Sequence, residues 1–198
     1  MKNLEKYKFK IDQKSRNNLN KHNSFVVWFI GLSGSGKSTI CNSLEELLYT
    51  KKINTFILDG DNVRNGLNKD LSFSDEDRSE NIRRVAEVSK ILMNAGSVVL
   101  SSFITPFNKD RKLAKKIIGE KNYIEVFVNT SLETCIDRDP KGLYAKSKSG
   151  IIKNMTGIGS DFEPPVHYNI EIKESSTIEE SVTMIFELIK DKLAIVNE

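Results

Sequence analysis

The sequence predicts an α/β fold in which a mostly parallel, five-stranded sheet carries helices on both faces. From Phe25 onward, short runs of β-branched and aromatic residues alternate with longer segments whose apolar residues recur every three or four positions. This alternation is typical of strand–helix–strand units, which build parallel sheets. The chain has 198 residues, 38% of them hydrophobic, which is enough for one substantial core and leaves little room for a second domain.

A glycine-rich motif follows the first predicted strand, residues 25–30, and precedes a helix that is expected to begin at Lys37. It meets every fixed position of the Walker A pattern and reads Gly31-Leu32-Ser33-Gly34-Ser35-Gly36-Lys37-Ser38. The glycines let backbone N–H groups point at phosphate oxygens, and the helix N-terminus adds its positive dipole. Lys37 is expected to bridge the β- and γ-phosphates of ATP, and the Ser38 hydroxyl to ligate Mg²⁺. The flanking strand and helix disfavour an ordinary Gly/Ser-rich turn, so we expect the three-layer P-loop NTPase fold.

The elements around this motif follow from local signals. Residues 1–24 are polar and show no sustained period, so we expect a flexible N-terminal arm before a kinase domain of residues 25–198. After the helix that extends to residue 49, a second strand is expected at 55–58, and it ends in Asp59-Gly60-Asp61-Asn62. Residues 63–72 are expected to form a loop or a short helix. A longer helix follows, with Ser74 as its N-cap, Asp77 at the third helical position and Gly96 as its stop.

The second half of the chain continues the same alternation. A third strand is expected at 97–104, a helix from Thr105-Pro106 to about 118, a fourth strand at 123–128, and a helix that Ser131 caps and that ends near 138. Residues 139–163 are rich in Gly and Lys, and a stretch of this length predicts a lid that closes over bound nucleotide; the alternative is a solvated surface excursion. A short strand at 168–172 precedes a final helix, which opens with a capping box of Thr177 and Glu180.

Composition excludes several classes of protein. The net charge of +3 is too mild to require nucleic acid, and no apolar stretch reaches transmembrane length. Cys41 and Cys135 each lie in an apolar helical pattern, which favours two reduced core thiols and a soluble protein of the cytoplasm. His22 and His167 have no partners at ligand spacing, so we expect surface histidines and neither a zinc site nor a catalytic triad.

The acidic residues point to a small-molecule kinase. A GTPase would need an Asn-Lys-x-Asp motif, which is missing, and a motor-type ATPase would carry an acid at the end of the third strand, where Ser101-Ser102-Phe103 stands instead. The acids follow the second strand, where Asp61 can hold a Mg²⁺-bound water and accept a proton from an acceptor hydroxyl. A turn or a helix cap is the alternative role for Asp59 and Asp61.

A group of arginines follows this acidic turn. Arg64 and Arg78 are suited to bidentate binding of a phosphate or sulfate group. Arg83 and Arg84 lie within the amphipathic helix near several glutamates, so we assign them to ion pairs on the helix surface.

Together the motifs resemble those of the adenylyl-sulfate kinase family, which phosphorylates the 3′-hydroxyl of adenylyl sulfate with ATP during sulfate assimilation. The resemblance spans nearly the whole chain after residue 24. It is carried by Gly31-Leu-Ser-Gly-Ser-Gly-Lys-Ser-Thr39, Leu58-Asp-Gly-Asp-Asn-Val-Arg64, Gly66-Leu-Asn68, Asp77-Arg78, Glu80-Asn-Ile-Arg-Arg84, Ser102-Phe-Ile-Thr-Pro-Phe107, Asp110-Arg111, Arg138-Asp-Pro-Lys-Gly-Leu-Tyr144, Thr156-Gly-Ile158 and Glu163-Pro164.

The resemblance implies a set of site residues. The catalytic positions are Lys37, Asp61 and Thr105, and Mg²⁺ belongs with Ser38 and, through water, with Asp61. ATP is assigned to Gly31, Leu32, Ser33, Gly34, Ser35, Gly36, Lys37, Ser38, Thr39 and Arg138. Adenylyl sulfate is assigned to Asp61, Asn62, Arg64, Phe73, Arg78, Asn81, Ile104, Thr105, Lys141, Leu143 and Met155, with Phe73 stacked on its adenine. The resemblance also implies a homodimer.

Two positions depart from the family pattern. Thr105 stands where the family usually has a serine that is described as a phosphoenzyme intermediate, although direct in-line transfer needs no such intermediate. Asn154-Met155 stands where the family typically has Gly-Phe, whose ring sandwiches the substrate adenine against the Phe73 position. Methionine packs on a ring face through its polarizable sulfur, and we expect weaker substrate binding than with phenylalanine at position 155.

Two other classes of function would share part of this pattern. A P-loop kinase for a sugar acid or a nucleoside would have the loop, the acidic turn and the lid, but would not need Phe73, Arg78 and Asn81 together with Lys141. A non-catalytic ATP-binding regulator would tolerate loss of Lys37 or Asp61, and both are present.

Overall fold

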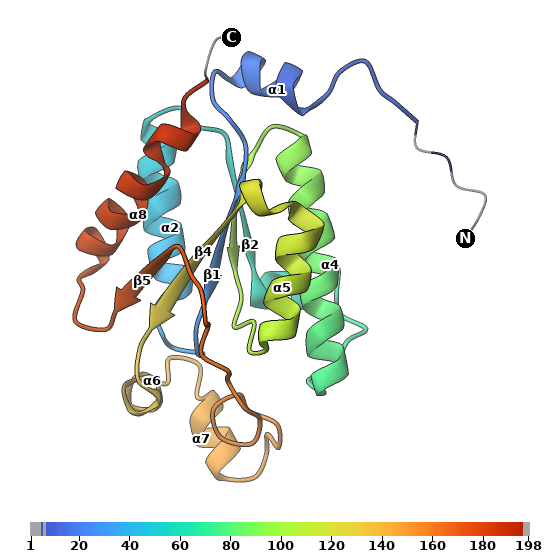
Figure 1. The fold of residues 1–198 in the computed structure, drawn as a ribbon. Helices are drawn as coiled ribbons and strands as arrows, with labels where there is room; N and C mark the ends of the chain where they lie inside the picture. Colours follow the sequence, from blue (N-terminus) through green and yellow to red (C-terminus); the bar gives the residue numbers. More distant parts are fainter. Residues whose placement is uncertain (1–4, 6, 196–198) are drawn as a thin grey trace.

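A five-stranded sheet forms the centre of the molecule, for which a computed structural model describes residues 5 and 7–195 (Figure 1). Its strand order is β2-β3-β1-β4-β5, and every neighbouring pair is parallel, which confirms the predicted sheet. The strands are β1 (Val26–Ile30), β2 (Thr55–Asp59), β3 (Val98–Ser102), β4 (Tyr123–Asn129) and β5 (Ile170–Lys173). Because all strands run the same way, their carboxyl ends meet along one edge of the sheet.

Helices cover both faces of the sheet and complete the three layers. α2 (Lys37–Thr50) and α8 (Ile178–Leu193) pack on one face, and α4 (Asp75–Asn94) and α5 (Asn108–Ile118) pack on the other (Figure 1). The shorter helices are α1 (Gln13–Asn20), α3 (Gly60–Asn65), η1 (Glu120–Asn122), α6 (Leu132–Arg138) and α7 (Leu143–Lys148). The α6 and α7 helices lie beyond the carboxyl ends of the strands, and α7 falls within residues 139–163, where the lid was predicted (Figure 1).

Buried apolar residues on both faces of the sheet form the core. Phe25, Val27 and Phe29 face α2 and α8, whereas Val26, Trp28 and Ile30 face α4 and α5. A strand that is buried on both faces reads as a continuous apolar run, as residues 25–30 do. Cys41 and Cys135 are buried free thiols, as predicted.

The predicted helix boundaries rest on capping residues that the structure confirms. Ser74 accepts a hydrogen bond from the Asp77 N–H, and Ser131 caps α6 in the same way. Thr177 and Glu180 form both bonds of the capping box of α8. Gly96, with φ +98°, follows the last residues of α4 and lets the chain turn toward β3.

The prediction of a flexible arm over residues 1–24 is wrong for its second half. Residues 13–20 form α1, whose N-cap Asp12 accepts a bond from the Ser15 N–H, and Asn20 donates to the Gly96 carbonyl at 2.9 Å. The helix is held mainly by amide side chains, so it lacks the apolar period by which helices are predicted. Residues 1–4 and 6 lie outside the described part of the chain.

The expectation of a surface histidine is wrong for His22, of which only 1% is exposed. Its Nε2 accepts a hydrogen bond from the Asn54 N–H at 3.0 Å, so the ring carries its proton on Nδ1, which donates to the Asn23 carbonyl at 3.0 Å. The ring therefore joins the segment after α1 to the entrance of β2.

Some boundaries also differ from those predicted. The third strand ends at Ser102 rather than at residue 104, since the chain turns there into a loop in which Thr105 adopts φ +45°. The short helix α3 begins at Gly60, directly after β2, because the Asp59 side chain caps it.

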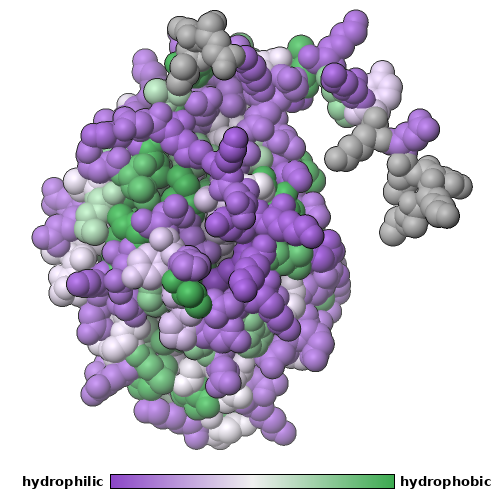
Figure 2. All heavy atoms as spheres, in the orientation of Figure 1, coloured by the Kyte–Doolittle hydropathy of each residue, from purple (hydrophilic) through white to green (hydrophobic). Residues whose placement is uncertain are grey.

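The surface of the molecule is mostly hydrophilic on the face shown in Figure 2. Hydrophobic residues gather over the region of α8, where Met184 and Leu188 are exposed. Within residues 5 and 7–195, none of the helices has the length and hydropathy needed to cross a membrane.

Candidate active site

A cleft of about 1000 Å³ opens at the carboxyl edge of the sheet. Its lining includes the glycine-rich loop, the starts of α3 and α4, the loop after β3, the stretch from Arg138 to Thr156, and residues at the end of β4 and between β5 and α8. Most of the predicted site residues meet here. They are Ser33, Gly34, Ser35, Gly36, Lys37, Ser38, Thr39, Asp61, Arg64, Phe73, Arg78, Asn81, Ile104, Thr105, Arg138, Lys141, Leu143 and Met155.

Three predicted residues do not line the cleft. Gly31 lies beneath the loop with φ +146°, and a Cβ there would come within 2.5 Å of the Val128 carbonyl oxygen, so the position requires glycine for close packing. Leu32 is 8% exposed and packs beneath the loop. Asn62 is exposed and lies outside the cleft lining.

The loop ends where α2 begins, and this junction is suited to binding phosphate. Gly34 and Gly36 adopt φ +78° and +105°, the left-handed region that glycine enters without strain. Gly36 is the N-cap of α2 and supplies no side chain to bond the first helical N–H groups. These N–H groups and the helix dipole therefore face the cleft without a side-chain cap, as an anion-binding site requires.

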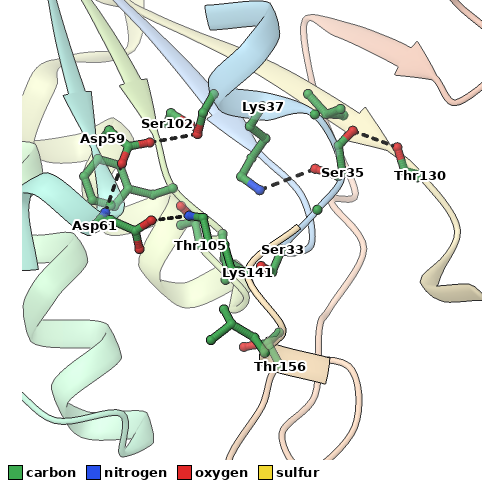
Figure 3. Close-up of a pocket in the computed structure, with 18 of the residues that line it drawn as sticks. Ser33, Ser35, Lys37, Asp59, Asp61, Ser102, Thr105, Thr130, Lys141 and Thr156 are labelled. Carbon is green, nitrogen blue, oxygen red and sulfur yellow. Dashed lines mark hydrogen bonds and ion pairs between the residues drawn. The ribbon is translucent and has the colours of Figure 1, made fainter. Parts of the chain in front are cut away.

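Lys37 lies buried at the base of the loop. Its Nζ donates to the Leu32 carbonyl at 2.6 Å. It also donates to the Ser35 hydroxyl at 3.4 Å (Figure 3). Burial lowers the pKa of Lys37 to about 8, because the charged ammonium loses water that the surrounding groups replace only in part. An anionic phosphate beside Nζ would favour the charged form.

Oxygen atoms from three elements converge in front of α2. The Ser38 hydroxyl donates to Asp59 Oδ2 at 2.8 Å, and its oxygen lies 3.2 Å from the Ser102 hydroxyl. Mg²⁺ prefers oxygen ligands and, in kinases, is shared with substrate phosphates and water, so this set of donors fits it. In the described part of the chain, no group of three or more His, Cys, Asp or Glu residues could hold a metal by itself. The sequence pointed to Asp61 for this position, whereas the carboxylate bonded to Ser38 is that of Asp59.

Asp59 is also a helix cap, the alternative role that the sequence left open for it. Its other carboxylate oxygen accepts from the Asp61 N–H at 3.0 Å and caps α3. Asp61 itself, with a side chain 60% exposed, forms an ion pair with Lys141 of the predicted lid (Figure 3). The carboxylate of Asp61 is therefore accessible from the cleft and paired with a cation of the predicted lid.

Arginine and an exposed aromatic ring line the other side of the cleft. The Arg64 guanidinium lies 4.5 Å from the centre of the Phe73 ring, and Arg78 donates to the Phe73 carbonyl at 3.1 Å. Arg78 also donates to Thr156 and to the Asn154 carbonyl, both in the predicted lid. Burial lowers the pKa of both arginines, yet from a usual value so high that they stay charged. Phe73 is 59% exposed, so its ring can take a stacking partner.

Arg83 and Arg84 form the surface ion pairs that were predicted for them. Arg83 pairs with Glu80 at 2.7 Å, and Arg84 pairs with Glu80 at 2.9 Å and with Asp70 at 2.8 Å. These arginines therefore stay outside the cleft.

Thr105 has a buried hydroxyl. The residue is 1% exposed, and its Oγ1 accepts from the Trp28 indole N–H at 3.0 Å. Its φ of +45° is unusual for a β-branched residue, and the Arg111 side chain, which donates to the Thr105 carbonyl at 2.9 Å, helps to hold this conformation.

Met155, which the sequence assigns to the substrate site, is mostly buried. It is 6% exposed and packs with Leu32, Cys135 and Tyr144, although it also borders the cleft.

Several residues at the site were not predicted from the sequence. Ser102 and Thr130, which donates to the Ser35 carbonyl at 3.0 Å, lie at strand ends that only the register brings beside the loop. Asn68 donates to the Asn81 side chain at 2.9 Å from a fully buried position. Tyr144 reaches the Ser33 carbonyl, 111 residues away in the sequence. The position of Ser102 at the carboxyl end of the third strand could have indicated that it lies at the cleft. The other residues make contacts that depend on tertiary structure and leave no signal in the sequence.

The comparisons with known proteins agree with this geometry. The family model described as adenylylsulphate kinase matches residues 23–173. The adenylyl-sulfate kinase of Oceanobacillus iheyensis is 48% identical over 191 residues, 96% of each chain. The enzyme of the same name from Pseudomonas entomophila is 48% identical over 193 residues, 97% of this chain and 93% of that one. The structure of the Mycobacterium tuberculosis APS kinase CysC in complex with AMPPNP and APS superimposes with a TM-score of 0.83 and 41% identity, covering 85% of this chain and 98% of that one.

Proposed function

The chain belongs to the adenylylsulphate kinase family, and on that basis we propose which of its residues perform the reaction. The protein is an enzyme that transfers the γ-phosphoryl group of ATP to the 3′-hydroxyl of adenylyl sulfate in sulfate assimilation. The products are 3′-phosphoadenylyl sulfate and ADP. The observation that carries the assignment of residues is one cleft with a phosphate-binding loop on one side and Asp61, Arg64, Phe73 and Arg78 on the other.

ATP binds with its phosphates in the glycine-rich loop. The N–H groups at the start of α2 and the Lys37 ammonium neutralise charge on the β- and γ-phosphates. Lys37 exchanges its bonds to Leu32 and Ser35 for phosphate oxygens, a short movement for a flexible side chain. Arg138 and Thr39, which also line the cleft, lie at the edges of the nucleotide site.

The metal site is the oxygen cluster in front of α2. Ser38 and Asp59 would hold Mg²⁺, directly or through water, and Asp61 would join the same site only through water. Bound Mg²⁺ supplies positive charge to the β- and γ-phosphates.

Asp61 accepts the proton in the transfer step. As the 3′-oxygen forms its bond to the γ-phosphorus, the bond to the β–γ bridging oxygen breaks and ADP takes that electron pair. The hydroxyl proton passes to the Asp61 carboxylate, directly or through one water. The ion pair with Lys141 holds this carboxylate at the cleft, between the phosphate-binding loop and the predicted lid. Direct in-line transfer needs no phosphoryl carrier, and the Thr105 hydroxyl has a structural role instead, since it accepts from the Trp28 indole N–H.

Adenylyl sulfate lies between Asp61 and the lid. Arg64 and Arg78 face its sulfate and phosphate groups, since guanidinium groups bind such anions through paired hydrogen bonds. Phe73 stacks on the adenine. The remaining residues assigned to this substrate that line the cleft are Asn81, Ile104, Thr105, Lys141, Leu143 and Met155; Asn62, which lies outside the lining, is left out of the assignment.

The test follows the reaction with purified protein, Mg-ATP and adenylyl sulfate, measuring ADP release and the mass of the product. We expect 3′-phosphoadenylyl sulfate from the native chain and from Asp70→Asn, which removes a surface carboxylate outside the cleft. Asp61→Asn should lose nearly all turnover while still binding ATP. Full turnover by Asp61→Asn would overturn the role of Asp61, and ATP binding without product from the native chain would overturn the assigned acceptor.

We further propose that the enzyme works as a homodimer in the cytoplasm, without nucleic acid or membrane as a partner. The family resemblance supports the dimer, and two free buried thiols suit a reducing compartment. Light scattering during size-exclusion chromatography tests the dimer, which a monomer mass would contradict.

A further inference from the structure

Tyr144, in the first turn of α7, contacts the glycine-rich loop directly. The residue is 1% exposed, and its hydroxyl donates to the Ser33 carbonyl at 2.9 Å. The proposed function leaves this contact without a role, because Tyr144 does not line the cleft. The contact nevertheless joins the predicted lid to the middle of the phosphate-binding loop.

The bonded carbonyl belongs to the same peptide unit as the Gly34 N–H. The two groups of a trans peptide point in opposite directions, so a donor that fixes the Ser33 carbonyl also fixes the direction of the Gly34 N–H. Gly34 lines the cleft, and within residues 5 and 7–195 its N–H makes no hydrogen bond with the protein. An N–H that is oriented into a cleft and left unpaired is the kind of donor that a phosphate oxygen accepts from.

Several contacts fix the Tyr144 hydroxyl in place. The Asp139 carboxylate accepts from the Tyr144 N–H at 3.1 Å and from the Ala145 N–H at 2.9 Å, which sets the start of α7. The ring packs with Leu32, Cys135 and Met155. Burial raises the pKa of Tyr144 above its usual value, so the hydroxyl remains a donor through neutral and mildly alkaline pH.

We propose that Tyr144 is a positioning residue for ATP: its hydroxyl holds the Ser33–Gly34 peptide in the orientation that binds phosphate. The inference rests on the proposed function, since it concerns the ATP subsite of that enzyme. In this proposal the predicted lid also orders the phosphate-binding loop. Lys141 contacts Asp61 from the same segment that contacts the loop through Tyr144, so closure of the lid and order in the loop are linked.

The experiment compares Tyr144→Phe with the native enzyme. Phenylalanine keeps the ring and its packing and removes only the hydroxyl, so the lid is expected to fold. Loss of one hydrogen bond corresponds to a weakening of about 3- to 10-fold, which we expect in the Kd of Mg-ATP and of ADP, measured by calorimetry without adenylyl sulfate. The KM for ATP should rise by a similar factor, while the KM for adenylyl sulfate stays within about twofold and adenosine, which has no phosphate, binds unchanged.

Tyr123→Phe is the matched control, because Tyr123 is also buried and donates its hydroxyl to Glu125 outside the cleft. It should change the melting temperature but neither nucleotide constant. Unchanged affinity of Tyr144→Phe for ATP and ADP, or an equal loss for adenosine, would show a purely structural role and overturn the proposal. Native turnover is measured in parallel, so failure of the proposed function is seen separately from failure of this inference.

Discussion

At the scale of single residues, Lys37 is buried, which favours its neutral form, although phosphate binding requires its charged form. Its pKa of about 8 means that much of the Lys37 side chain is neutral above that pH, whereas a bound phosphate favours the ammonium. We therefore expect ATP binding at pH 9 to take up a proton, and the apparent affinity to fall as pH rises through 8, by at most about tenfold per pH unit.

Calorimetry of Mg-ATP binding in two buffers with different ionisation enthalpies measures this proton uptake. The observed enthalpies should differ at pH 9 and agree at pH 6.5, where Lys37 is charged before binding. Lys37→Met should bind ATP weakly without the buffer dependence. Equal enthalpies in both buffers at pH 9 would contradict the lowered pKa.

The two carboxylates beside Gly60 have separate roles that substitution can distinguish. Asp61→Asn should lower kcat by about 10²- to 10⁴-fold, the range for loss of a general base, with little change in the Mg²⁺ concentration at half-maximal rate. Asp59→Asn should raise that Mg²⁺ concentration, because Asp59 is bonded to Ser38. Rates measured at a series of Mg²⁺ concentrations distinguish the roles of the two carboxylates. An unchanged Mg²⁺ requirement in Asp59→Asn would contradict the role of Asp59 and favour Asp61 as the metal-binding residue.

Met155 tests how far a buried residue affects substrate affinity. Met155→Phe should bind adenylyl sulfate more tightly, by about 2- to 10-fold, since an aromatic ring stacks on adenine with a larger and flatter surface. The KM for ATP should stay constant. Because Met155 packs with Leu32 and Tyr144, the melting temperature must be measured alongside. A titration in which the native chain binds adenylyl sulfate as tightly as a stably folded variant would refute the prediction.

At the scale of elements, α1 is part of the folded domain rather than an appendage. Asn17 and Ser24 are buried and bonded to each other at 2.8 Å, and His22 is bonded to the entrance of β2. Removing residues 1–10 should leave the free energy of unfolding nearly unchanged. Removing residues 1–23 should lower it by about 2 kcal/mol or more, because several buried bonds of about 1 kcal/mol each are lost. Urea unfolding of the two truncated proteins measures their free energies of unfolding. Equal values would show that α1 adds nothing to stability and would support the prediction of a flexible arm.

The elements that the sequence predicted are those whose signals are local. Ser74, Ser131 and Thr177 cap their helices through bonds to residues three positions away, and the strand at 25–30 is continuously apolar. The Walker loop is also local, because its glycines and Lys37 act within one turn of chain. By contrast, α1 is held by the hydrogen bond from the Asn20 side-chain amide to the Gly96 carbonyl, 76 residues away in the sequence. The Ser38–Asp59 and Tyr144–Ser33 hydrogen bonds likewise join segments that are 21 and 111 residues apart. No period or spacing encodes such pairs, so they follow only from the strand order and the path of the lid.

At the scale of the whole molecule, the predicted lid, residues 139–163, borders both proposed substrate regions. Its first part follows α6, and its last part is held at Glu163, whose carbonyl accepts from Arg111 at 2.6 Å and whose carboxylate accepts from the Asn108 N–H at 2.7 Å. Arg111 also donates to the carbonyls of Thr105 and Pro106, in the loop after β3. One buried guanidinium therefore sets the position of the lid and of the loop that borders the cleft.

The substitution Arg111→Lys should loosen both the predicted lid and the loop after β3. Lysine keeps the charge but offers a single compact donor group instead of a planar fork, so it cannot serve three carbonyls in the same arrangement. We expect the KM values for ATP and adenylyl sulfate to rise together, and trypsin to cut faster at the exposed Lys146 and Lys148 of α7. Cleavage at Lys190 on the distant α8, analysed by mass spectrometry in the same digest, is the internal control. If cleavage at all three lysines accelerated equally, Arg111 would stabilise the fold in general; if only the α7 sites responded, the arginine anchors the lid.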